Sequence, residues 1–215
     1  MGQGDEQRVA RELRVARLCN ASPEEFRHVP DFPLTVPEWR EFLSVHSAKH
    51  LASKGFRAAL EERRAPWFTE AHRDTGWLGR EPASEAAVAA AEERLGVRLP
   101  PTYRNFLLVS NGWNSIGLLD LREVEEIGWF TEKAADLLDV WEELEDFTGE
   151  LAILRRCLLI SVDEGGSGGN WLLHADSVRE DGEWTAYEWW PCHGGDPKPY
   201  EDFAAMAKHA SDAVT

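Results

Sequence analysis

The residues from Asp163 to Asn170, DEGGSGGN, form the one glycine-rich loop of the sequence, and the loop follows an apolar stretch of strand length. Loops that bind phosphate lie in such places, but they need a lysine after the glycines and a helix behind them. Here the carboxylates of Asp163 and Glu164 would repel phosphate, and another strand-like segment follows. The spacing also differs from that of a helix-loop-helix calcium site. We therefore interpret the loop as a hairpin connection. An enzymatic or ligand-sensing role for this loop is kept as an alternative to the partner-binding functions considered below.

Thiol and imidazole groups offer a second possible chemistry. Cys157, His174, Cys192 and His193 could be assembled into a metal site, but these four residues include no C-x-x-C or H-x-x-x-H pair to anchor one. Residues 165–169, GGSGG, match the letters of the G-x-S-x-G turn of a serine nucleophile, but that turn needs a helix behind it, and a strand-like segment follows here. The 3 cysteines are too few for a disulfide framework. We therefore predict no catalytic residue, no metal and no cofactor, and a protein that is not an enzyme.

Aromatic residues among acids offer the third possibility, contact with a protein partner. Trp189 and Trp190 are adjacent on an expected strand, so one of them faces away from the side on which the other packs. Trp113 follows an Asn-Gly stop and is expected in a loop. The candidate partner-binding residues are Trp113, Asn114, Asp163, Glu164, Glu188 and Trp190.

The charge of the chain is strongly uneven. The net charge is −16, yet residues 1–82 carry 13 basic and 13 acidic side chains, so residues 83–215 hold the whole excess. Such a surface repels nucleic acid and anionic lipid and attracts a basic partner, although it also serves solubility. No apolar run reaches the length of a membrane span, and charges stand at the N-terminus where a signal peptide needs an apolar block. We therefore expect a cytoplasmic protein.

Two short helices joined by a tight turn form the most specific pattern of the chain. Ser84 can cap the first helix, and Gly96 supplies the left-handed residue that ends it. Pro101 suits the first position of the second helix, which Gly112 stops. Helices this short are not stable alone, so we expect both to lie on a sheet. The residues expected to be buried there are Leu95, Leu99, Tyr103, Phe106 and Leu107.

The rest of the pattern predicts a sheet flanked by helices. The expected strands are 118–121, 124–129, 157–162, 170–174 and 184–190, with 157–162 central because its apolar run is continuous. We expect one helix from Thr131 to near Phe147 and a last one marked by Tyr200 and Phe203.

The first part of the chain predicts further helices. Pro37 opens one that carries Trp39, Phe42 and Leu43 on one side, and Gly55 is expected to break it. Because an apolar helical face is unfavourable in water, residues 1–75 are expected to be a helical extension that packs on a domain formed by residues 76–215.

Several of these segments resemble the SUKH superfamily, the Smi/Knr type of domain. The resemblance rests on the helix that ends in Glu92-Glu93-Arg94-Leu95-Gly96, on Leu99-Pro100-Pro101 with Tyr103 and Phe106-Leu107, and on Asn111-Gly112. Weaker matches are 125–130, 158–163 and 184–190 with Tyr200 and Phe203. The match covers roughly residues 76–210 and implies an α+β fold with a mixed or antiparallel sheet flanked by helices.

The resemblance also implies a function. Many bacterial members of the superfamily look like immunity proteins encoded beside polymorphic toxins, which are often nucleases. We therefore expect a partner-binding protein whose acidic surface covers a basic toxin domain. The alternative is a regulatory or scaffold protein of the same family that has no toxin partner, as its fungal members suggest.

Overall fold

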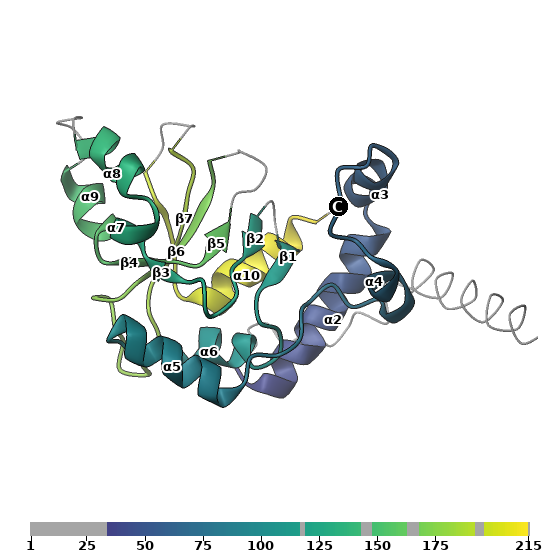
Figure 1. The fold of residues 1–215 in the computed structure, drawn as a ribbon, viewed down its shortest axis with the longest axis horizontal. Helices are drawn as coiled ribbons and strands as arrows, with labels where there is room; N and C mark the ends of the chain where they lie inside the picture. Colours follow the sequence, from purple (N-terminus) through teal and green to yellow (C-terminus); the bar gives the residue numbers. More distant parts are fainter. Residues whose placement is uncertain (1–33, 117–118, 143–147, 163–167, 192–195, 215) are drawn as a thin grey trace, which may run out of the picture.

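The structure is a computed structural model, and it describes residues 34–116, 119–142, 148–162, 168–191 and 196–214. It confirms the α+β fold class, with helices of the N-terminal part preceding two antiparallel sheets (Figure 1). The helices are α2 (Val36–Ala52), α3 (Lys54–Glu61), α4 (Glu70–Thr75), α5 (Glu85–Leu95), α6 (Pro101–Leu107), α7 (Phe130–Lys133), α8 (Ala135–Glu142), α9 (Thr148–Leu154) and α10 (Phe203–Asp212). The strands are β1 (Trp113–Ile116), β2 (Leu119–Leu121), β3 (Gly128–Trp129), β4 (Cys157–Leu159), β5 (Ser161–Val162), β6 (Asn170–His174), β7 (Ala186–Trp189) and β8 (Lys198–Tyr200).

The expected central strand 157–162 serves two sheets. Its first half, β4, lies in the five-stranded sheet of order β3-β4-β6-β7-β8, and its second half, β5, lies in the three-stranded sheet of order β1-β2-β5. The division falls at Ile160, whose N–H donates to the carbonyl of Trp171 while its own carbonyl accepts from the N–H of Arg122. The expectation of one strand is therefore wrong, because the backbone pairs with β3 and β6 before Ile160 and with β2 after it.

The five-stranded sheet has an apolar layer on each face. Cys157 and Leu159 of β4 point to one face and Leu158 to the other, as the two-residue period of a strand requires. On one side lies the main cluster, to which α2, α5, α6 and α10 contribute. On the other side lies the outer cluster, formed by Phe130, Leu138, Trp141, Leu151, Leu154, Cys157, Leu159, Leu172 and Trp189. Helices α7, α8 and α9 cover that outer face (Figure 1).

The helix pair of the sequence pattern is confirmed. The Ser84 hydroxyl accepts from the N–H of Ala87 at 3.1 Å, and Gly96 ends α5 with a φ of 70°. The five residues expected to be buried all belong to the main cluster. Helix α6, however, ends at Leu107 rather than near residue 111, because the following residues turn away and the Asn111 side chain accepts from the N–H of Val124.

The first described helix packs deeply into the main cluster. Thr35 and Glu38 form a capping box at the start of α2, and Trp39, Phe42 and Leu43 are buried. The Trp39 ring lies 5.5 Å from that of Phe106 on α6 and 5.4 Å from that of Phe203 on α10. These contacts tie α2 to both the helix pair and the last helix.

Other expected boundaries need correction. Helix α2 ends at Ala52 rather than at Gly55, because the next residue, Ser53, is extended and its hydroxyl caps α3 by accepting from the N–H of Phe56. Residues 124–126 form a turn, and only 128–129 of the expected strand 124–129 form a strand, β3. The single helix expected after Thr131 begins at Phe130 and breaks at Ala134, whose φ of −139° is not helical.

Candidate partner-binding surface

Two predicted contact residues, Trp113 and Asn114, are buried in β1 rather than exposed in a loop. The centroid of the Trp113 ring lies 5.1 Å from that of the Trp77 ring. The side-chain oxygen Oδ1 of Asn114 accepts a hydrogen bond from the guanidinium of Arg80 at 3.1 Å. Gly79 makes a β-bridge with Trp113, and a Cβ on Gly79 would lie 2.5 Å from the Trp113 ring. The prediction that Trp113 is an exposed anchor is therefore wrong, because a segment more than 30 residues earlier in the sequence covers it.

The two adjacent tryptophans do face opposite sides of the sheet, as expected. Trp189 is buried in the outer cluster, whereas Trp190 is half-buried against the main cluster and beside Gly169. Glu188, another predicted contact residue, accepts a hydrogen bond from the Tyr200 hydroxyl at 2.9 Å. Trp190 and Glu188 are thus partly engaged within the fold.

The last two predicted contact residues, Asp163 and Glu164, lie outside the described residues, as do Cys192 and His193. Cys157 and His174 are neighbours, since they stand opposite each other in the register of β4 and β6. Burial raises the pKa of the Cys157 thiol, which therefore stays protonated at neutral pH. Within the described ranges no group of three or more His, Cys, Asp or Glu side chains is arranged to hold a metal ion.

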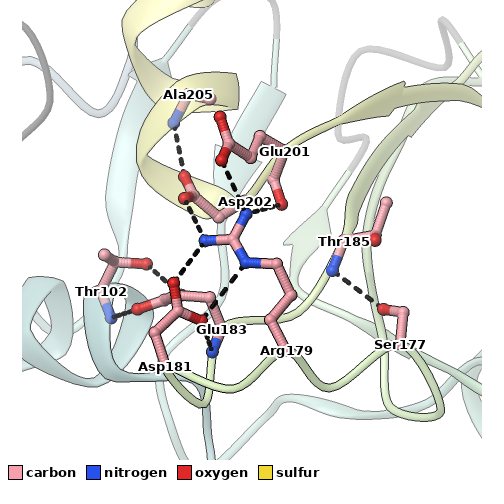
Figure 2. Close-up of polar contacts among 9 residues, drawn as sticks. All are labelled: Thr102, Ser177, Arg179, Asp181, Glu183, Thr185, Glu201, Asp202 and Ala205. Carbon is pink, nitrogen blue, oxygen red and sulfur yellow. Dashed lines mark hydrogen bonds and ion pairs between the residues drawn. The ribbon is translucent and has the colours of Figure 1, made fainter.

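A polar network ties the turn between β6 and β7 to the starts of two helices (Figure 2). Glu183, nearly buried, accepts from both the N–H and the hydroxyl of Thr102 on α6, each at 2.7 Å. Asp202 caps α10 by accepting from the N–H of Ala205. The guanidinium of Arg179 joins these parts, because it pairs with Asp202 at 3.2 Å and with Asp181 at 3.0 Å. Because each of these polar groups has a partner, the network can hold the turn between β6 and β7 against the starts of α6 and α10.

Glu183 supplies a testable measure of that network. We expect Glu183→Ala to lower the free energy of unfolding by about 2–3 kcal/mol, because it leaves a buried N–H and hydroxyl of Thr102 without an acceptor. Glu183→Gln should cost clearly less, since burial raises the pKa of this carboxyl and a neutral amide keeps one acceptor. Urea unfolding of the two variants at neutral pH measures the difference. Equal losses for Ala and Gln would show that the charge, rather than the acceptor, matters here.

The helices that cover the outer face, α7, α8 and α9, carry 5 acidic side chains and 1 basic one. Residues 130–154 contain 8 acidic side chains and 1 basic one, so this stretch holds a net charge of −7 out of the −16 of the chain. On α8, Leu138 and Trp141 point into the outer cluster, whereas Asp136, Asp139 and Glu142 are exposed. Asp136 and Asp139 form no ion pair with another described residue.

An exposed apolar side chain lies within this acidic face. Val140 has 59% of its surface exposed, and it follows Asp136 and Asp139 at the helical spacing that places all three on one side of α8. We call Asp136, Asp139 and Val140 the α8 face. Sequence reasoning missed it, although the inward positions Leu138 and Trp141 already imply that residue 140 points outward.

These features describe an α+β domain with two packed apolar layers and an acidic outer helix. A family model described as SMI1 / KNR4 family (SUKH-1) matches residues 82–209, more than half of the chain, and the protein therefore belongs to that family. The helices α2, α3 and α4 precede the matched residues. A comparison with curated proteins gave no match. Within the described residues, no helix is long and apolar enough to cross a membrane.

Proposed function

We propose that this protein is a non-enzymatic immunity protein, which neutralises a basic toxin domain by covering its active surface. The observation that carries the proposal is the α8 face together with its acidic surroundings, on a member of the SUKH-1 family. A nuclease must present basic side chains to phosphate, so an acidic surface can occupy the same place. Opposite charges steer the two proteins together, and an apolar side chain at the centre slows their separation.

The partner to test is a basic toxin domain encoded beside the gene. We expect stopped-flow association to slow by roughly tenfold between about 20 mM and about 150 mM salt, because salt screens exposed charges. Asp136→Lys with Asp139→Lys should lower the association rate by roughly threefold to tenfold more. Val140→Ala should mainly raise the dissociation rate, by about fivefold.

A matched control comes from the other end of the molecule. Glu41 on α2 and Glu61 on α3 are exposed acids, and α3 lies far from α8 in the fold (Figure 1). Glu41→Lys with Glu61→Lys changes the net charge equally and should leave the association rate nearly unchanged. Equal effects of the two double variants would show that only the net charge matters. No binding to a neighbouring toxin would instead favour the alternative, a regulatory protein of the same family.

A further inference from the structure

Two histidines lie on the buried side of α2, near the end of that helix. His46 is fully buried and His50 is 8% exposed, and their ring centroids are 6.0 Å apart. Figure 1 shows that this end of α2 lies beside α3 and the end of α10. The two rings therefore lie where the N-terminal helices, which precede the family match, meet the rest of the protein.

The surroundings of both rings suit the neutral form of histidine. The His46 Nδ1 atom is 3.0 Å from the Ser211 hydroxyl on α10, and the His46 ring lies 5.9 Å from that of Trp113 on β1. His50 packs at 5.0 Å on the ring of Phe56 on α3. Within the described residues, His46 Nε2 and His50 Nδ1 have no hydrogen-bond partner. A protonated ring would place an N–H at each of these atoms without an acceptor.

Among the residues that the structure describes, no carboxylate forms a hydrogen bond or an ion pair with either ring, so none balances a positive charge there. On α2 itself, Lys49 adds a second cation, and it donates to the backbone carbonyl oxygens of Ser211 and Asp212. The remaining charged groups are engaged or exposed. On α10 the Asp212 carboxylate is paired with Lys208. On α3, Lys54 is exposed, and Arg57 donates to the backbone carbonyls of Ala52 and Ser53. In the segment before β1, Arg80 is paired with Glu123.

Burial therefore opposes protonation of both histidines. It lowers the pKa of His46 from an ordinary 6.5 to about 3, helped by the charges of His50 and Lys49, and it lowers the pKa of His50 as well. A base whose pKa is lowered by folding stabilises the packed state fully only above its unfolded pKa. The stabilisation is lost as the pH falls below about 6.5 toward 3.

We propose that residues 46–62, the end of α2 together with α3, form an acid-sensitive contact that opens locally when His46 and His50 are protonated. The start of α2 stays packed, because the contacts of Trp39 with Phe106 and Phe203 are apolar and do not depend on pH. Opening removes His46 from the ring of Trp113, while Trp77 and Gly79 keep their contacts with that ring. A mildly acidic compartment or growth medium would thus uncover one side of a side chain that is fully buried at neutral pH.

Hydrogen–deuterium exchange of the full chain tests the proposal, with labelling times corrected for the intrinsic effect of pH. Between about pH 7 and about pH 5 we expect the open population of peptides from 46–62 to rise by about 20-fold, which is the shift that one histidine titrating from 6.5 to about 3 produces. Peptides from 36–43 and from the five-stranded sheet should change far less. Equal acceleration in all these regions would show global unfolding and would overturn the proposal.

His46→Asn separates the titration from the packing. Asparagine can keep the hydrogen bond to Ser211 but carries no charge in acid, so the 20-fold rise that His46 produces should be lost and only the rise due to His50 should remain. Substitution of the exposed His209 on α10 by Asn is the matched control and should leave the rise intact. If His46→Asn does not fold, the regional pattern of the unsubstituted protein still decides the question. A rise that persists in a folded His46→Asn, His50→Asn double variant would also overturn the proposal.

Discussion

A chain that begins at residue 76 is expected to aggregate or to lose its cooperative melting transition. The truncation removes three side chains of the main cluster, Trp39, Phe42 and Leu43, and uncovers the rings of Phe106 and Phe203 against which Trp39 packs. Burying each such side chain stabilises a fold by roughly 1.5–3 kcal/mol, so their joint loss is comparable with the whole stability of a small domain. Differential scanning calorimetry and light scattering measure the result.

A second truncation separates the role of α2 from that of the residues before it. A chain that begins at residue 34 keeps α2 with its capping box and should melt cooperatively. The expectation fails if the chain from residue 76 stays monomeric and melts at the temperature of the full protein. In that case the N-terminal helices would be an independent module, despite their contacts with the main cluster.

Phe106→Ala should lower the free energy of unfolding by about 3–5 kcal/mol. The Phe106 side chain is fully buried, and its ring lies 5.5 Å from Trp39 and 5.2 Å from Phe203, so removing it leaves a space among rings held by three helices. The measurement is urea unfolding followed by circular dichroism. Val140→Ala, at a position with 59% of its surface exposed, is the control and should change stability by less than about 0.5 kcal/mol. A loss below about 1 kcal/mol for Phe106→Ala would contradict the packing described here.

The helix pair could be predicted from sequence because its signals are local. Ser84, Gly96 and Pro101 act on their own backbone or on residues a few positions away, and the structure places each of them at the helix boundary it was expected to mark. The burial of Trp39 was also predictable, since a proline-started helix with an apolar side needs something to cover it. In these cases the residue that determines the structure and the backbone it acts on lie within a few positions of each other, or on the same helix.

The misplaced elements depend on contacts between distant parts of the chain. Trp113 was expected in a loop, yet its strand is completed by Gly79 on one edge and by β2 on the other. The run 157–162 has the apolar pattern of one strand, but nothing local indicates that its backbone changes sheets at Ile160. Pairing partners are properties of the assembled fold, so hydrophobic periodicity alone cannot assign them.

The candidate partner-binding surface was also predictable only in part, because composition is visible in the sequence and side-chain direction is not. Charge counting located the acidic excess in the second part of the chain, but the individual contact residues were chosen because they were aromatic, acidic or in expected loops. Trp113 and Asn114 proved buried, and Glu188 is engaged by Tyr200. The α8 face emerges only when the burial of Leu138 and Trp141 fixes the direction in which Val140 points.

The two apolar layers of the five-stranded sheet support different helices of the surface. The helix pair packs in the main cluster, whereas α8 rests on the opposite face through its own cluster around Trp141 and Trp189. Substitutions on the outward side of α8 therefore touch neither set of packing contacts. The charge and apolarity of this surface are thus set by residues other than those that set its shape, and the two can be altered separately.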